Sequence, residues 1–390
     1  MSVEVVTLGC RMNLAESERL RVLLADAGDI TVVNSCAVTA EAARDTRRAI
    51  RRARRARPNA RLLVTGCAAE IDRAVIAAMP EVDGIVANAA KLDPRAWNAP
   101  ASGHAVTAAH TRAFIAVQNG CDHACTFCVI PQGRGPSRSQ PVAAVLRQVE
   151  PHLGAGAREV VLTGVDLTAW GEDLPNRPRL GSLVTALLGT FPELPRLRLS
   201  SLDGIEIDVE LTELIAAEPR VMPHLHLSLQ HGDDLILKRM KRRHRRADAL
   251  ALVAGLRERR PEIAIGADLM AGFPTENAEA HGANLSIVCE LGIVHGHVFP
   301  YSSRPGTAAV RMPQVATETI RTRAAELRAA VAAERARWHQ SLLGRPQRVL
   351  AERDGTGHGE SFARVCLPAS TPAGRIVTLT PTRIAQGLLA

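Results

Sequence analysis

Three cysteines lie close together in the segment QNGCDHACTFCVIP, residues 118–131. They are Cys121, Cys125 and Cys128, and their spacing is C-x3-C-x2-C. The whole chain of 390 residues holds eight cysteines, which are too sparse for a disulfide scaffold. Clustered thiols in such a chain are more often metal ligands or reactive groups.

Several kinds of site compete for these three thiols. A structural zinc ion usually takes four ligands, and no second cysteine pair or H-x3-H lies at the usual distance. A ferredoxin would supply four thiolates to its cluster. Three thiolates would leave one iron of a cluster open, which is useful only if a substrate or cofactor occupies that iron. The remaining alternative is a turn that gathers three cysteines by chance.

Three more cysteines each follow a short apolar run: Cys10 ends VVTLGC, Cys36 ends TVVNSC and Cys67 ends LLVTGC. If these runs are strands of one parallel sheet, their carboxyl ends lie at the edge where ligands bind. We therefore expect the three thiols to converge on one point. The alternative is that they are small core residues, a description that suits Cys289 and Cys366 better.

The elements that would position the strand-end cysteines alternate in type. Short apolar runs separated by helical stretches predict a parallel sheet with crossover helices. The expected strands are 3–8, 31–33, 61–66 and 84–87. We predict an α/β domain with a flavodoxin-like open sheet over residues 1–90. The periodicity is lost from residue 88, where Pro, Ala and Gly accumulate, so a linker is expected over 91–112.

A second alternation of strands and helices begins at residue 113. Its strand candidates lie near residues 114, 159, 196, 224, 263 and 294. Six units are too few for the eight-stranded barrel, so we predict an open partial (β/α)6 barrel over 113–340, which ends in a long helix. The loop with the three clustered cysteines follows the first barrel strand, at the end where such barrels place their sites. The tail, 341–390, predicts a small antiparallel β module.

The formal net charge is +8, and the positive charge is concentrated in two runs. Residues 44–57 hold eight arginines and one aspartate, and residues 238–246 hold seven Lys or Arg and no acid. Such runs indicate a polyanionic partner, with RNA as the leading candidate, or else a solvated helix face. No apolar stretch is long enough to span a membrane, and the first residues do not resemble a signal peptide, so we expect a cytoplasmic protein.

The clustered cysteines, with Phe127 just before the last of them, resemble the loop of the radical S-adenosylmethionine (SAM) superfamily. The resemblance implies that Cys121, Cys125 and Cys128 hold a [4Fe-4S] cluster whose fourth iron binds SAM. Reductive cleavage of SAM would then give methionine and a 5′-deoxyadenosyl radical, which abstracts hydrogen from an unactivated carbon.

Further motifs narrow the resemblance to one family. The segments LGCRMN, NSCAVT, GCDHACTFCVIPQGRGPSRS, HLHLSLQ, GFPTE and PYSSRPGTAA are similar to those of the methylthiotransferases over about residues 3–310, and the tail resembles a TRAM module. The family implies a second [4Fe-4S] cluster on Cys10, Cys36 and Cys67. One SAM would methylate a sulfide on this cluster, a second SAM would yield the radical, and the substrate carbon would capture the methylthio group.

The resemblance also implies which residues contact SAM, all of them at or near strand ends. The expected contacts are Phe127, Thr163, Gly164, Ser200, Gln230, Asp268 and Gly272. Arg242 and Arg304 match basic family positions that could meet SAM or substrate. His231 is a departure, because family members usually have serine between the corresponding glutamine and glycine. The tail is short for a TRAM module.

Within the family, the sequence most resembles the branch that acts on N6-threonylcarbamoyladenosine beside the tRNA anticodon, at carbon 2 of the base. The runners-up are the isopentenyladenosine branch and the branch that modifies an aspartate of a small-subunit ribosomal protein. The implied partners are tRNA, SAM and an electron donor such as flavodoxin or ferredoxin. A hypothesis of another class is a noncatalytic iron-sulfur protein that binds RNA or transfers electrons.

Overall fold

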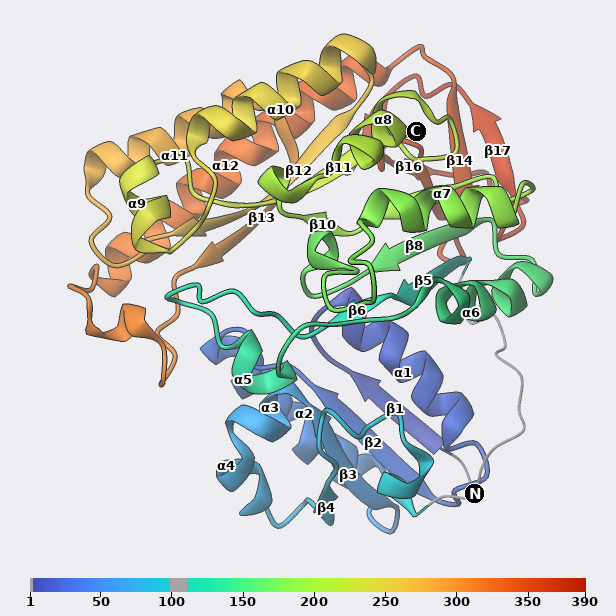
Figure 1. Ribbon diagram of the computed structural model, residues 1–390, viewed down its shortest axis with the longest axis vertical. Helices are drawn as coiled ribbons and strands as arrows, with labels where there is room; N and C mark the ends of the chain where they lie inside the picture. The colour runs from blue at the N-terminus through green and yellow to red at the C-terminus, as the bar shows by residue number, and fades with distance from the viewer. Residues whose placement is uncertain (1–2, 99–110) are drawn as a thin grey trace.

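The computed structural model describes residues 3–98 and 111–390. A first α/β domain, a curved sheet with helices outside it, and a β module follow one another along the chain (Figure 1). The first sheet is parallel, as predicted, with its strands in chain order: β1 (Val3–Thr7), β2 (Ile30–Ser35), β3 (Arg61–Gly66) and β4 (Gly84–Ile85). This order lacks the reversal that characterises the flavodoxin sheet.

Helices cover both faces of the first sheet, because its central strands point apolar side chains to both sides. Val32 packs with Leu20 of α1, whereas the next residue, Val33, packs with Ile50 of α2. Thr39 caps the amino end of helix α2, because its hydroxyl accepts a hydrogen bond from the Ala42 N–H at 3.1 Å. The helices are α1 (Arg11–Leu23), α2 (Ala40–Ala56), α3 (Cys67–Ile71) and α4 (Arg73–Ala77).

Part of the segment expected as a linker packs on this first domain. The 3-10 turn η1 (Pro94–Trp97) buries the Trp97 ring, and the indole N–H donates to the Lys91 carbonyl at 2.9 Å. A buried aromatic side chain contributes a large apolar area to a core. The rest of the expected linker, 99–110, lies outside the described residues.

The central sheet has the six parallel strand positions that the sequence predicts. They are β5 (Arg112–Ala116), β8 (Glu159–Thr163), β9 (Leu197–Leu199) with its continuation β10 (Ser201–Leu202), β11 (His224–Gln230), β12 (Ala264–Ala271) and β13 (Ile293–Pro300). Between strands β5 and β8 lie β6 (Gln118–Asn119), α5 (Ile130–Arg134) and β7 (Arg138–Ser139). The predicted partial barrel is confirmed.

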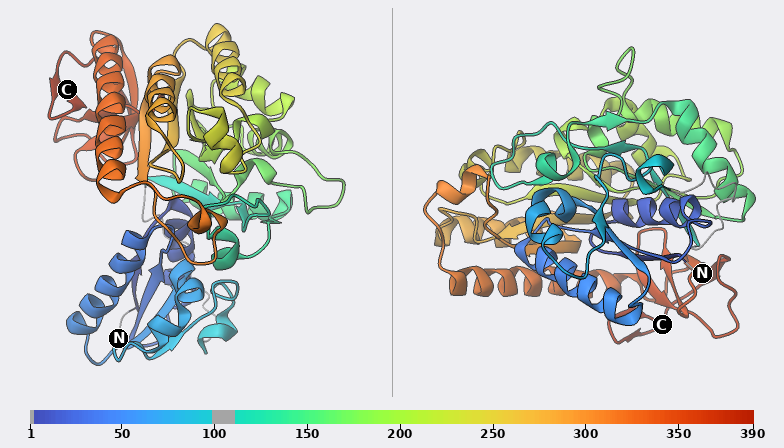
Figure 2. Two further views of the ribbon diagram at one scale, coloured as in Figure 1. Left: turned by 90° about the vertical axis from the view of Figure 1, so that its left-hand side faces the viewer. Right: turned by 90° about the horizontal axis from the view of Figure 1, so that it is seen from below.

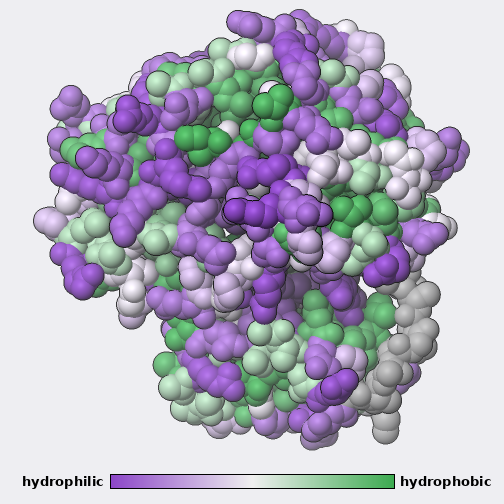
Figure 3. Space-filling view, viewed as in Figure 1, coloured by the Kyte–Doolittle hydropathy of each residue, from purple (hydrophilic) through white to green (hydrophobic). Residues whose placement is uncertain are grey.

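The main hydrophobic core lies between this sheet and the helices outside it. These helices are α6 (Val142–Gly154), α7 (Leu180–Thr190), α8 (Val209–Ala217), α9 (Asp234–Arg239), α10 (Arg246–Arg259), α11 (Ala278–Glu290) and α12 (Thr317–Leu342). Hydrophilic residues cover much of the face shown in Figure 3, with apolar residues scattered among them. Within residues 3–98 and 111–390, no helix is both long and apolar enough to cross a membrane.

The tail forms the predicted β module and packs beside α12 (Figure 2). Its sheet has the order β17-β14-β15-β16-β19-β18, and most of its pairings are antiparallel. The strands are β14 (Gln347–Ala351), β15 (Thr356–Gly359), β16 (Arg364–Cys366), β17 (Ile376–Leu379), β18 (Ile384–Ala385) and β19 (Leu388–Leu389).

Phe362 joins the tail to both other parts of the molecule. Its ring stacks on His358 at 4.4 Å and is approached by the Arg198 guanidinium of the barrel at 4.8 Å. The guanidinium of Arg11, from the first domain, lies 5.4 Å from the same ring. Cations over an aromatic face are attracted to it, so this one ring contacts all three parts of the chain.

Candidate functional site

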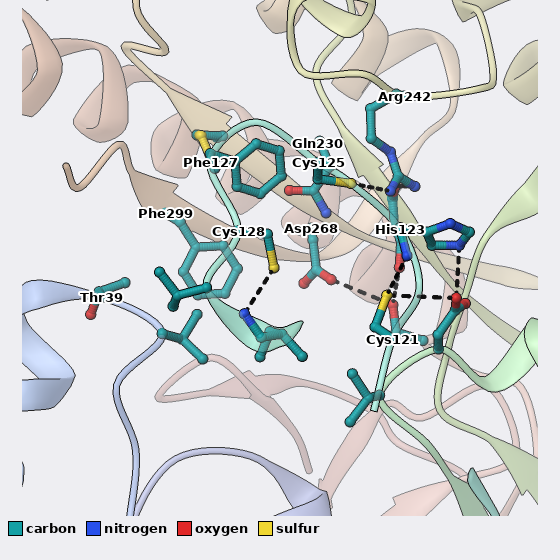
Figure 4. Close-up of a pocket in the computed structure, with 18 of the residues that line it drawn as sticks. Thr39, Cys121, His123, Cys125, Phe127, Cys128, Gln230, Arg242, Asp268 and Phe299 are labelled. Atoms are coloured by element: carbon teal, nitrogen blue, oxygen red, sulfur yellow. Dashed lines mark hydrogen bonds and ion pairs between the residues drawn. The ribbon is translucent and has the colours of Figure 1, made fainter. Parts of the chain in front are cut away.

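The loop with the three clustered cysteines lies at the carboxyl end of β5 and lines a cavity of about 280 Å³ (Figure 4). Cys121, Cys125 and Cys128 all contribute to the lining, together with the ends of later barrel strands. Val38 and Thr39 of the first domain line it as well. The cavity therefore lies where the first domain meets the partial barrel.

Gly120 allows the cysteine loop its path. Its φ is +77°, and an added Cβ would lie 1.9 Å from the Pro136 carbonyl oxygen. The Cys121 N–H donates to the Gly135 carbonyl at 3.1 Å, which closes the loop on itself. Only glycine adopts this conformation at low cost while leaving room for the backbone opposite.

Gly120→Ala is therefore expected to displace the loop and to lose one cluster. A strained left-handed residue costs about 1–3 kcal/mol before any clash is counted. We expect the reconstituted variant to hold about four irons where the parent holds about eight, since each cubane carries four. Iron analysis with Gly156→Ala as control measures this, because Gly156 has a φ of +90° with open space around it. Full iron content in Gly120→Ala would contradict the expectation.

Arg242 lies against the clustered thiols, and several groups fix its position. Its Nη1 is 3.7 Å from the Cys125 sulfur, while Nη2 donates at 2.8 Å both to Asp203 and to the Ser228 carbonyl. Burial raises the pKa of Cys121 to about 12 and, with a smaller contribution from Cys125, that of Cys128 to about 11. Without a metal these two thiols are protonated at neutral pH, so a metal must displace their protons.

The strand-end cysteines also come together, as the sequence predicts. Cys10 precedes α1, Cys36 follows β2, and Cys67 is the first residue of α3. A Cβ on Gly9 would lie 2.7 Å from the Cys36 sulfur, so these two loops touch. Burial raises the pKa of Cys36 to about 11, and the thiols of Cys10 and Cys67 add to the rise.

The spacing of the thiols fits clusters better than single ions. Among the described residues, neither trio brings all three sulfurs within 4.8 Å of one another. A single zinc ion holds its thiolates at about 2.3 Å and would therefore need them closer together. A cubane distributes its thiolates over separate irons. Each trio therefore supplies the three thiolate donors that a [4Fe-4S] cluster with one open iron would take.

The pair of His123 and Asp166, beside Cys121, was not predicted from the sequence. His123 Nε2 lies 2.7 Å from an Asp166 carboxylate oxygen, which is itself 3.8 Å from the Cys121 sulfur. The hydrogen bond to Asp166 raises the pKa of His123. The position of His123 between two of the cysteines, in CDHAC, was a usable signal. No signal in the sequence connects it with Asp166, 43 residues later.

The predicted SAM contacts are only partly in the cavity. Phe127, Gln230 and Asp268 line it, as does Arg242. Thr163, Gly164, Ser200 and Gly272 are absent from the lining, whereas Val165, Asp166, Ser201 and Met270 are present. These four residues are one or two positions from lining residues. The roles of all seven predicted contacts stay predictions.

Two other residues noted in the sequence lie away from the cavity lining. Arg304 is buried, with Nη2 3.6 Å from an Asp72 carboxylate oxygen of the first domain. His231 is fully buried, and its Nε2 lies 3.1 Å from a Glu276 carboxylate oxygen. The departure at His231 is therefore not itself part of the cavity lining.

Comparison with known families agrees with this geometry. Residues 115–283 match the radical SAM superfamily, and residues 2–87 match an uncharacterized protein family, UPF0004. The partial barrel, its cysteine loop and the first match together define a radical SAM enzyme, a class that works with SAM and a [4Fe-4S] cluster.

Relatives over the full length define the family. The chain is 42% identical to the threonylcarbamoyladenosine tRNA methylthiotransferase MtaB of Rickettsia prowazekii, over 99% of this chain and 96% of the relative. It is 34% identical to the Aquifex aeolicus protein of that name, over 82% and 85%. It is 30% identical to a tRNA-2-methylthio-N(6)-dimethylallyladenosine synthase of Cereibacter sphaeroides, over 97% and 95%. The chain belongs to the radical SAM methylthiotransferase family.

Solved structures support the fold alone. The radical SAM methyltransferase TsrM from Kitasatospora setae has a TM-score of 0.53 at 16% identity, over 70% of this chain and 65% of that one. The cobalamin-dependent SAM radical enzyme OxsB has a TM-score of 0.51 at 10% identity, over 85% and 56%.

Proposed function

We propose that this protein attaches a methylthio group to carbon 2 of N6-threonylcarbamoyladenosine in tRNA. The observation that carries the proposal is the pair of three-cysteine sites, one on each side of the junction between the first domain and the barrel. When bound, the two clusters and SAM supply the electron, the carbon-centred radical and the sulfur that the reaction needs. This substrate is favoured because the chain is 42% identical to a relative named for threonylcarbamoyladenosine. It is 30% identical to a relative named for dimethylallyladenosine.

The chain's own residues bind the clusters and SAM and orient them. The six cysteines hold the clusters, and Arg242 presents a fixed positive charge beside Cys125. Phe127, Gln230 and Asp268 face the space in which SAM would lie. Side chains of both domains line this space and can hold reactants in a fixed orientation.

The arginine run supports an RNA partner less strongly than its composition suggests. Five of its eight arginines pair with nearby acids: Arg44, Arg48, Arg51, Arg54 and Arg57. Arg47, Arg52 and Arg55 have no ion pair within the described part of the chain, and the last two are exposed. Thr39, the N-cap residue of helix α2, lines the cavity. The unpaired arginines therefore extend from the cavity along the first domain.

Neutralising the three unpaired arginines to glutamine is expected to weaken tRNA binding. Each lost phosphate contact should lower the slope of log affinity against log salt by about 0.7–0.9. Filter binding at several salt concentrations measures the slope. Arg44→Gln with Arg48→Gln and Arg51→Gln is the matched control, since those arginines are already paired with acids. An equal loss of tRNA affinity in both triple variants would contradict the assignment of the phosphate contacts to the three unpaired arginines.

The substrate is tested by comparing nucleosides from cells with and without the gene. Loss of the methylthio form of threonylcarbamoyladenosine is the expected result. Loss of the methylthio form of isopentenyladenosine, or an altered mass of a small-subunit ribosomal protein with unchanged tRNA, would assign the chain to another branch.

Catalysis itself is tested by anaerobic reconstitution with a reductant and SAM. Formation of 5′-deoxyadenosine and methionine is expected, and their absence would favour a noncatalytic iron-sulfur protein. We further propose a small electron-transfer protein, such as flavodoxin or ferredoxin, as the reductant, and a cytoplasmic location.

A further inference from the structure

Three charged side chains are buried together between the first domain and the barrel. Arg134, at the end of α5, donates from Nη1 to Glu16 at 2.9 Å and from Nη2 to the other carboxylate oxygen at 3.1 Å. The Lys91 ammonium contacts the same carboxylate. Glu16, Lys91 and Arg134 are each at most 4% exposed. We refer to these three residues as the interdomain ion triad.

The triad is bonded to residues beside the strand-end cysteines. Arg134 Nη2 also donates to the Asn13 carboxamide oxygen, and the Asn13 NH2 group donates to the carbonyls of Leu8 and Ser35. Leu8 lies two residues before Cys10, and Ser35 directly precedes Cys36. Two of the three first-domain cysteine loops are therefore held by one asparagine, which Arg134 orients.

The third first-domain loop, which carries Cys67, is held by Gly133, the residue directly before Arg134. The Gly133 carbonyl accepts from the Asn88 carboxamide at 2.6 Å, and the Asn88 N–H donates to Glu70 of α3. A Cβ on Gly133 would lie 3.2 Å from the Cβ of Cys67. Helix α5 therefore packs directly on the first turn of α3.

The same arginine is also fixed to the loop of the other trio. Arg134 Nη1 donates at 2.7 Å to the side chain of Asn119, two residues before Cys121. Helix α5 itself begins two residues after Cys128. One guanidinium thus contacts the element that carries each cysteine trio, and it is the only cation of the triad that comes from the barrel.

The charges of the triad do not balance. One carboxylate faces two cations, which leaves about one positive charge in the interior, and a buried charge without a counter-ion is costly. The missing counter-charge is available when the first-domain thiols are deprotonated to bind iron.

We propose that Arg134 is a positioning residue for methylthiolation: it fixes the first-domain cysteine loops against the loop of Cys121, Cys125 and Cys128. Its charge also stabilises the reduced form of the cluster on Cys10, Cys36 and Cys67. The net charge around an iron-sulfur cluster is one of the factors that set its reduction potential. The inference rests on the proposed function, because it requires a cluster on the first-domain trio.

The test uses the full chain with Cys121, Cys125 and Cys128 changed to alanine, so that only the first-domain cluster is present. In this background, Arg134→Gln is expected to lower the midpoint potential, measured by redox titration with EPR. The expected effect is at least a tenfold lower ratio of reduced to oxidised cluster at a fixed potential, equivalent to 59 mV for one electron. Arg134→Lys keeps the charge and should restore the parental potential.

Arg138→Gln is the matched control. Arg138 is exposed, and its side chain donates to the Arg134 carbonyl at 3.4 Å, so solvent screens its charge and the potential should not change. A parental potential in Arg134→Gln, with its four irons in place, would overturn the proposal. Fewer than four irons in the parent background would instead count against the proposed function.

Hydrogen exchange of the iron-free full chain provides a readout that needs no cluster. Arg134→Gln should speed exchange in the segments around Asn13 and Ser35, whereas Arg138→Gln should not. If Arg134→Gln fails to retain iron, its potential cannot be measured, and hydrogen exchange then tests the proposal. Faster exchange there would support the fixing role, and unchanged exchange in these segments would overturn it.

Discussion

Cys10→Ala should abolish methylthiolation while SAM cleavage continues. Cys10 is one of the three ligands proposed for the first-domain cluster, and two thiolates would leave a cubane poorly held. The barrel trio does not include Cys10, so radical formation should persist without sulfur transfer. We expect the methylthio product to fall below detection while 5′-deoxyadenosine is still formed, both followed by mass spectrometry after anaerobic turnover.

Cys289→Ala is the control for this experiment. Cys289 lies exposed on α11, and its substitution should change neither product. Unchanged methylthio product in Cys10→Ala would remove this cysteine from the reaction. Loss of 5′-deoxyadenosine as well would show that the two cysteine sites cannot be separated functionally.

Cys125→Ala is expected to give the complementary result, with loss of both products. Its sulfur is the one that Arg242 approaches at 3.7 Å, within the loop that lines the cavity. Cys125 is a proposed ligand of the barrel cluster, and without it the chain would lack the site at which SAM would be activated. Formation of 5′-deoxyadenosine and of the methylthio product should both fall below detection.

The iron content distinguishes this effect from unfolding. Cys125→Ala should retain about four irons on the first-domain trio, since each cubane carries four. A variant with four irons that still cleaves SAM would contradict the role given to the loop of Cys121, Cys125 and Cys128. A variant with no iron would indicate collapse of the whole junction, for which Cys366→Ala, in the tail, is the control.

The elements that carry the two trios could be predicted because their signals are local. Short apolar runs marked the strands, and each strand-end cysteine lies within three residues of the end of such a run. Parallel strands that neighbour one another bring their carboxyl ends to one edge, so convergence followed from topology alone. The convergence of Cys10, Cys36 and Cys67 did not depend on the flavodoxin order of strands.

Contacts between distant segments could not be predicted in this way. The pairing of Arg134 with Glu16 joins residues 118 positions apart, and neither residue differs in its local sequence from a surface charge. The pairing of His123 with Asp166 likewise depends on how two loops approach each other. Placing a strand also leaves open which of two successive side chains faces the cavity. For this reason Ser201 lines the cavity and Ser200, predicted to do so, does not.

Phe362 connects the carboxyl-terminal module with the first residues of the chain through its contact with Arg11. Arg11, which touches this ring, is the neighbour of Cys10 in the sequence. Removing the last fifty residues would leave that guanidinium without its aromatic contact and would expose the flank of the barrel beside α12. Damage around Phe362 should therefore reach Cys10, more than 350 residues earlier in the chain, even where RNA makes no contact with the carboxyl-terminal sheet.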